Sequence, residues 1–73
     1  MMPRKPESFG AILRRVREKT ALSVADLADA AGVSRESVRL YELGDRRPTW
    51  DAVQLLAVAL GVSTDTFRDR PTG

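Results

Sequence analysis

Ser34-Arg35-Glu36-Ser37-Val38-Arg39-Leu40-Tyr41-Glu42, followed closely by Gly44, is the stretch around which the chain is organised. Its first residue, Ser34, is a favourable helix N-cap, and Gly44 can end the helix in a left-handed conformation. At about 100° per residue, this helix places Val38 and Tyr41 on one face. The other face carries Arg35, Glu36, Arg39 and Leu40. The sequence therefore predicts a short helix with a charged outer face.

The simplest interpretation of this charged face is a solvated surface. The residues before the stretch support a second interpretation. Ser23 can cap a preceding helix, with Asp26 three positions on in a capping-box pattern, and Gly32 can end that helix. On its inward side, the small residues Ala28 and Ala31 allow a second helix to cross closely. The two short helices are joined by a short turn at Gly32 and Val33. Their lengths, and the residues that begin and end them, are those of a helix-turn-helix.

Two more helices and a short final turn are predicted outside this pair. The apolar spacing favours one helix over Phe9 to about Lys19, another over Trp50 to Leu60, and a turn over Thr64 to about Arg68. Phe67 in the final turn is expected to plug the core. No strand alternation is present, so the predicted fold is all-α, a compact five-helix domain. The expected N-caps of these segments are Ser8, Thr49 and Ser63.

The helix over Trp50 to Leu60 is apolar on two sides. Its expected core face consists of Trp50, Val53, Leu56, Ala57 and Leu60. The remaining apolar residues, expected elsewhere on the helix, are Ala52, Leu55, Val58 and Ala59. Because a small monomer has little reason to leave such a side in water, we expect Leu55, Val58 and Ala59 to contact a second copy of the chain.

Composition limits the classes of function. At 73 residues the chain can form one small domain, expected at 8–68, between a flexible basic N-terminal arm at 1–7 and a C-terminal tail at 69–73. It has no cysteine and no histidine, which leaves catalysis and metal binding poorly provided for. We therefore expect no enzyme activity, no metal, no cofactor and no small-molecule ligand.

The charged and apolar residues indicate a soluble, intracellular protein whose arginines suit contact with anions. Twelve basic residues, ten of them arginine, outnumber ten acidic ones, for a net charge of +2. Arginine suits bidentate contact with phosphate and guanine, although this net charge alone is weak support for nucleic acid. No apolar run approaches the ~18 residues of a membrane helix, and the N-terminus lacks the apolar region of a signal peptide. We expect a cytoplasmic location and no membrane partner.

The order of these signals resembles the lambda-repressor/Cro-like helix-turn-helix family, also called the Xre family. The likeness runs from Phe9 to about Phe67, nearly the whole chain. Each signal alone is common, whereas their order at these intervals is specific. The residues that carry the likeness are Leu22-Ser23, Leu27-Ala28, Ala31-Gly32-Val33-Ser34, Val38, Glu42 with Gly44, Arg46 with Pro48, and Leu60-Gly61-Val62-Ser63.

The resemblance implies that the helix at about 34–43 lies in the major groove of DNA, with the preceding helix across the backbone. Arginine can pair with both acceptors of guanine, glutamate can accept from cytosine N4, and leucine can contact a thymine methyl group. For Ser23 and Ser34, helix capping alone is the simpler role. The implied base contacts are Arg35, Glu36, Arg39 and Leu40, and the implied phosphate contacts are Ser23, Ser37, Arg46 and Arg47.

The resemblance also implies a partly buried ion pair between Arg17 and Glu42, joining the first predicted helix to the third. The alternative is two solvated surface charges worth less than ~1 kcal/mol. Glu42 lies near the boundary between the two faces of its helix, where pairing is feasible. We favour the buried pair, with a positioning role rather than a DNA contact.

Two residues depart from the family pattern. Members often carry glutamine directly after the serine that opens the second helix, where its amide can hold a phosphate, and here that residue is Val24. Leu40 occupies a position that is usually polar. These departures put one backbone contact in doubt and keep open a reading in which the fold serves protein binding.

The leading prediction is a sequence-specific DNA-binding transcriptional regulator, repressor-like, of bacterial or phage type. A single domain of this size offers a small contact area, so we expect a homodimer on double-stranded DNA with two half-sites. The alternative is a helix-turn-helix-fold protein–protein interaction module with weak or no specific DNA binding. An enzyme has the least support, because the sequence contains no phosphate-binding glycine loop and no recognisable pair of catalytic carboxylates.

Overall fold

The computed structural model describes residues 8–67, and over this range the chain forms four α-helices and one 3-10 turn. The sequence-predicted arm at 1–7 and tail at 69–73, together with position 68, lie outside the described residues. The elements, in chain order, are α1 (Phe9–Lys19), α2 (Val24–Ala31), α3 (Arg35–Leu43), α4 (Trp50–Leu60) and η1 (Thr64–Phe67).

The predicted all-α class is confirmed, but the predicted count of five helices is wrong in its last element. The final segment, η1, is a four-residue 3-10 turn. The amide of Thr66 donates to the carbonyl of Ser63 over 3.1 Å, a bond that spans three residues. So short a segment closes its turn through this tighter pattern, because an α-helical turn needs bonds that span four residues.

Each α-helix begins at a side-chain hydroxyl, as the sequence predicts. Each hydroxyl oxygen accepts from the amide three positions on, at 3.0–3.2 Å. The carboxylate of Asp26 also accepts from the amide of Ser23, which completes the predicted capping box. The N-caps are Ser8, Ser23, Ser34 and Thr49, and the glycines that end α2, α3 and α4 with positive φ are Gly32, Gly44 and Gly61.

The connection between α1 and α2 turns without a glycine. Ala21 has a φ of 58°, in the left-handed region that side chains with a β-carbon disfavour. Its amide donates to the carbonyl of Glu18 over 3.1 Å, and the next amide, of Leu22, donates to the carbonyl of Arg17 over 3.3 Å. These bonds hold the turn, whereas an alanine gives no sequence signal for this conformation.

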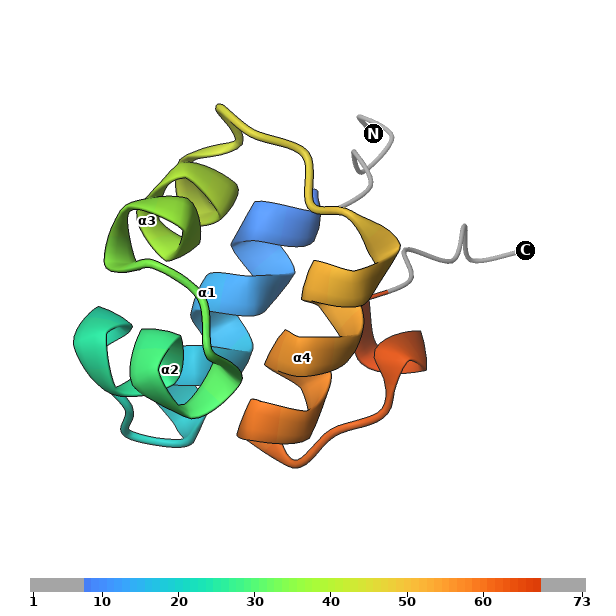
Figure 1. The fold of residues 1–73 in the computed structure, drawn as a ribbon. Coiled ribbons are helices and arrows are strands. Elements are labelled where there is room, and N and C mark those ends of the chain that lie inside the picture. Colours follow the sequence, from blue (N-terminus) through green and yellow to red (C-terminus); the bar gives the residue numbers. More distant parts are fainter. Residues whose placement is uncertain (1–7, 68–73) are drawn as a thin grey trace, which may run out of the picture.

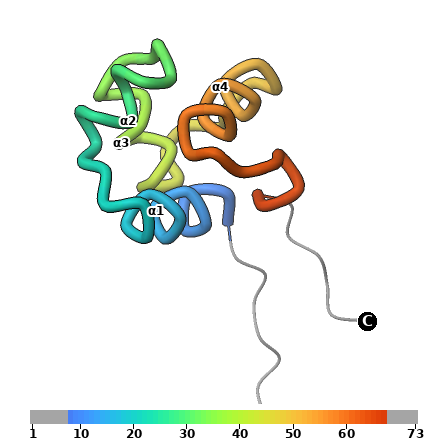
Figure 2. The backbone as a smooth tube through the Cα atoms, turned by 90° about the horizontal axis from the view of Figure 1, so that it is seen from below, coloured from blue at the N-terminus to red at the C-terminus, as the bar shows by residue number. Residues whose placement is uncertain are grey.

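The helices pack around one apolar core. Figure 1 shows α4 beside the α2–α3 pair, and in Figure 2 α1 lies to one side of these three helices, with η1 folded back beside the start of α1. Phe67 is buried with its ring centroid 5.1 Å from that of Phe9, so the prediction that it plugs the core is confirmed. The buried core residues are Ile12, Leu13, Val16, Leu27, Ala28, Ala31, Val38, Tyr41, Ala52, Leu56, Ala57, Leu60 and Phe67.

The orientation of α4 differs from the prediction at two residues. Trp50, expected in the core, is 60% exposed, and Ala52, expected outside it, is buried. Ala52 belongs to the buried core, whereas Trp50 is the first residue of the helix and lies at the surface. The nearly continuous apolar composition of this helix concealed which side faces inward.

Helix α1 approaches the C-terminal end of α3 closely at Gly10. A Cβ added at Gly10 would overlap the backbone carbonyl oxygen of Tyr41 and would lie 2.8 Å from that of Glu42. Next to this contact, the rings of Phe9 and Tyr41 pack edge to face with centroids 6.2 Å apart. The contact requires glycine, although a glycine inside a helix signals only a lower helix propensity when the sequence is considered alone.

Replacing Gly10 with alanine should lower stability despite the better helix propensity of alanine. Propensity alone favours alanine by ~1 kcal/mol, whereas a Cβ forced against backbone atoms that cannot rotate away should cost ~3 kcal/mol. We expect a net loss of about 2 kcal/mol and a melting temperature several degrees lower, measured by circular dichroism. Ala11→Gly, at the neighbouring exposed position, changes propensity alone and serves as the control. A Gly10→Ala protein more stable than the wild type would contradict the close approach.

Candidate nucleic-acid interface

The side chains of α3 lie on two faces, one buried and one exposed, as its sequence predicts. Val38 and Tyr41 are buried in the core. The core therefore holds α3 by one side and leaves its other side at the surface. On that surface lie the four residues considered for base contacts, with Arg35, Glu36 and Arg39 exposed and Leu40 half-buried.

The outer face of α3 contains one further residue, which was not among those predicted from the sequence. Leu43, the last residue of the helix, is 73% exposed. It follows Arg39 by four positions and Leu40 by three, so it lies beside both of them on the helix surface. Extending the same helical spacing by one turn would have identified it.

Two residues considered for phosphate contacts are hydrogen-bonded to each other. Arg46 donates from Nη1 to the Oγ of Ser37 over 3.1 Å, and the hydroxyl of Ser34 donates to the same oxygen over 2.8 Å. The Oγ of Ser34 accepts in turn from the amide of Ser37. The Ser37 hydroxyl thus accepts twice and keeps its own hydrogen for a further acceptor. This network brings a guanidinium from the loop after α3 back to the first turn of α3.

The other two residues considered for phosphate contacts are Arg47 and Ser23. Arg47 is exposed in the loop between α3 and α4. Ser23 performs the simpler role of capping, since its Oγ accepts from the amide of Asp26 over 3.0 Å. Val24, where the family often has glutamine, is half-buried and packs against the core. It therefore contributes apolar packing in place of a polar side chain.

Arg17 of α1 and Glu42 of α3 form an enclosed two-point ion pair. The distances are 2.7 Å from Nε to Oε2 and 3.1 Å from Nη2 to Oε1. The two side chains are only 14% and 9% exposed. The remaining guanidinium nitrogen, Nη1, donates to the carbonyl of Leu22 over 3.0 Å. One arginine therefore fixes α3 to α1 and also to the connection before α2.

The enclosure of this pair separates it from ordinary surface charges. The Glu42 carboxylate raises the pKa of Arg17, mainly through the hydrogen bond, while partial burial opposes the rise. A raised pKa in the folded state stabilises the fold at every pH below the ordinary value for arginine, so this contribution does not change near neutral pH. By contrast, the Arg14–Glu18 contact is 3.7 Å long between side chains that are 66% and 60% exposed, where water and salt screen it.

Two of the three residues expected at a dimer interface lie on the outer surface of α4. Leu55 is 47% exposed and Val58 is 80% exposed. Ala59 is half-buried and packs against the core, so it offers less surface than expected. Trp50 adds an exposed ring at the start of the same helix.

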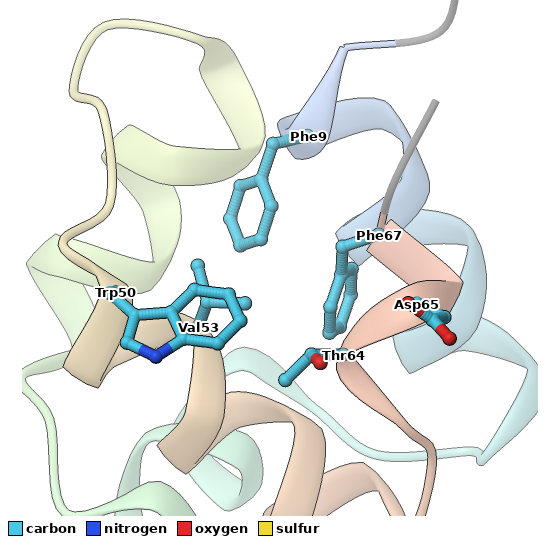
Figure 3. A pocket seen from close by; sticks show the side chains of 6 residues that line it. All are labelled: Phe9, Trp50, Val53, Thr64, Asp65 and Phe67. Carbon is cyan, nitrogen blue, oxygen red and sulfur yellow. The ribbon is translucent and has the colours of Figure 1, made fainter. Parts of the chain in front are cut away.

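A shallow hollow of about 210 Å³ lies beside Trp50. In Figure 3 the indole faces the ring of Phe67 across this hollow, with Phe9 above and Val53 between them. The carboxylate of Asp65 points away from the indole in the same view. This lining offers apolar contact rather than acid and base groups aimed at a common point.

The described part of the chain has neither a metal-binding cluster nor a membrane-spanning helix. Among residues 8–67, no group of three or more histidine, cysteine, aspartate or glutamate side chains is placed to hold a metal ion. Within the same range, no helix has the length and apolar character needed to cross a membrane.

Comparison with known proteins identifies the family. Residues 8–70 match the family model described as a helix-turn-helix domain, and the chain belongs to this family. It is 41% identical over 61 residues to an HTH-type transcriptional regulator of Mycobacterium bovis, an alignment that covers 84% of this chain and 24% of that protein. The chain thus spans about a quarter of the length of this relative.

Solved structures with the same fold include regulators. The restriction-modification controller protein C.AhdI from Aeromonas hydrophila is 32% identical, with a TM-score of 0.81, and the match covers 82% of this chain and 91% of that one. The P22 c2 repressor, solved in complex with a synthetic operator, is 26% identical, with a TM-score of 0.78 and coverages of 84% and 92%. The expected resemblance to repressor domains is confirmed, and these relatives are named as regulators.

Removing one partner of the Arg17–Glu42 pair should destabilise the protein strongly. Arg17→Ala strands the enclosed Glu42 carboxylate, and the loss should be about 3–5 kcal/mol. Arg14→Ala is the matched control on the same helix, because its exposed contact is worth at most about 1 kcal/mol. Urea-induced unfolding, followed by circular dichroism, measures both variants. Equal and small losses would show that Arg17 behaves as a solvated surface charge.

Proposed function

We propose that this protein is a sequence-specific DNA-binding transcriptional regulator of the repressor type, acting in the cytoplasm. The observation that carries the proposal is the outer face of α3, where Arg35, Glu36 and Arg39 are exposed on a helix held rigidly from behind. These side chains can pair with guanine and cytosine edges. Family membership supports the same function, as does the P22 c2 repressor with its operator.

In this proposal α3 enters the major groove and α2 crosses the backbone above it. The base contacts come from Arg35, Glu36, Arg39 and Leu40. Their positions along a single helix let them reach successive base pairs. Because the helix is fixed by the core and by the Arg17–Glu42 pair, little order has to be gained on binding.

The phosphate contacts come from the start of α2, the start of α3 and the loop after α3. Ser37 and Arg46 act together, because the hydrogen bond between them holds the guanidinium beside a hydroxyl that still has a hydrogen to donate. Arg47 and Ser23 supply further donors. Val24 supplies none, so we place the number of phosphate contacts at the lower end of the family range.

We infer that the protein binds as a homodimer through the outer surface of α4. Leu55 and Val58 are exposed apolar residues on one helix, and a second copy of this surface can cover them. A single small domain buries only ~600–1,000 Å² on DNA, so two domains on two half-sites raise both affinity and specificity.

A second candidate function is a protein-binding module that keeps the same fold. Two observations favour the protein-binding module. Val24 packs against the core where the family often has a polar side chain, and α4 carries exposed apolar residues. The two functions differ in one measurable property, which is preference among DNA sequences.

Arg39→Ala and Arg47→Ala should separate base reading from backbone contact. Arg39→Ala should cost about 1–3 kcal/mol on the preferred site and flatten the preference at one base position per half-site. Arg47→Ala should weaken all DNA sequences about equally and lower the slope of log affinity against log salt by about one per monomer. The measurement is a selection from random duplexes for each protein, followed by salt titrations on the selected sequence.

The same selection can overturn the proposal. If the wild type enriches no sequence, the regulator function fails and the protein-binding module replaces it. If Arg39→Ala keeps the wild-type preference profile, α3 does not read bases through that residue. A specific complex that is indifferent to salt would contradict the phosphate roles of Arg46 and Arg47.

Introducing a charge on the outer surface of α4 should break the dimer. Val58→Glu and Leu55→Glu place carboxylates at the proposed two-fold contact, where like charges meet without solvation. Sedimentation equilibrium should give a dimer for the wild type and a monomer for both variants. Ala30→Glu adds the same charge at an exposed position of α2 and should remain dimeric. Unchanged mass for both α4 variants would exclude this surface from the interface.

A further inference from the structure

The C-terminal end of α3 carries an apolar surface that the proposed hydrogen-bonding contacts do not use. Leu40 is half-buried and Leu43 is 73% exposed. The two are three positions apart, so their side chains are neighbours on the helix surface. Together they form a continuous apolar patch on the same outer face as Arg39.

The helix does not need the side chain of Leu43 in order to end. Gly44 takes a φ of 82°, and the amide of Asp45 donates to the carbonyl of Leu40 over 2.9 Å. These backbone features close the helix by themselves. The residue two positions beyond Leu43 is an aspartate, which provides no apolar partner for the leucine. The exposed side chain of Leu43 therefore takes no part in ending the helix.

The surroundings of this patch fit DNA better than a protein partner. Glu36 and Arg39 lie on the same face and are exposed, so a protein packed there would have to bury both charges. The major groove instead presents hydrogen-bonding base edges beside one apolar group, the C5-methyl group of thymine. A face that mixes charged and leucine side chains matches this pattern.

We propose that Leu43, together with Leu40, contacts C5-methyl groups of thymine, which makes Leu43 a specificity-determining residue. The inference rests on the proposed DNA-binding function and extends it. Leu43 lies eight residues after Arg35, about 12 Å farther along the helix axis, so the two contact different base pairs. Each half-site then has two parts, one read through hydrogen bonds near the start of α3 and one read through methyl groups near its end.

The test removes the methyl group and leaves the base pairing unchanged. Each thymine of the selected half-site is replaced in turn by deoxyuridine, and the dissociation constant is measured by fluorescence anisotropy. For the wild type, at least one replacement should weaken binding about fourfold per half-site, the value of one buried methyl group. Leu43→Ala should bind the thymine site more weakly and should no longer distinguish thymine from deoxyuridine at that position. Leu43→Met keeps an apolar side chain of similar volume and should retain the distinction.

Each other outcome has its own meaning. If no deoxyuridine replacement weakens the wild type on a site that it does select, the inference is wrong while the proposed function stands. If Leu43→Ala still distinguishes the two bases and Leu40→Ala does not, Leu40 alone reads the methyl group and the role of Leu43 is wrong. If Leu43→Ala changes the oligomeric state, the patch is a protein interface and the inference is also overturned. If the selection enriches no sequence, the proposed function fails and the inference falls with it.

Discussion

The contact between α1 and α3 is the constraint on which the proposed site depends. Gly10 lets the backbones meet, and the two-point bond from Arg17 to Glu42 fixes the rotation of α3 about its own axis. Rotation matters because successive side chains on a helix point about 100° apart. If α3 rotated about its axis, Arg39 would no longer point away from the domain, and a core residue of the helix would move towards solvent. The direction in which the outer face of α3 points is therefore set by contacts of this helix with α1, and not by the exposed residues themselves.

Local signals made the helix limits predictable, whereas residue spacing predicted no contact between distant residues, and the Arg17–Glu42 pair was expected only from the family resemblance. A hydroxyl or a glycine acts on its own turn, so the sequence alone locates the start and end of a helix. The exchange of Trp50 and Ala52 between core and surface depends on which helix packs against α4, and an apolar helix does not show this. The requirement for glycine at position 10 and the bond between Ser37 and Arg46 join parts of the chain that no spacing rule connects.

Arginine has two distinct functions in this small domain, and burial decides which one each residue has. Arg17 is enclosed and has three hydrogen bonds within the protein, so it acts as part of the framework. Arg39 and Arg47 are exposed and lie on or beside α3, where their charge faces outward. Arg46 stands between these cases, since one bond restrains it without burying it. Composition counts these residues together, and only the structure separates them.

The short connections and self-contained caps of the helices also determine how quickly the fold can form. Between consecutive α-helices the chain has only the segments 20–23, 32–34 and 44–49, and each helix carries its own start signal. Small helical domains with mostly local contacts fold in microseconds to milliseconds. Ribosomal synthesis of a chain is far slower, at about 5–20 residues per second. The domain can therefore finish folding in less time than the ribosome needs to add one further residue, so synthesis rather than folding limits how soon the folded domain is available.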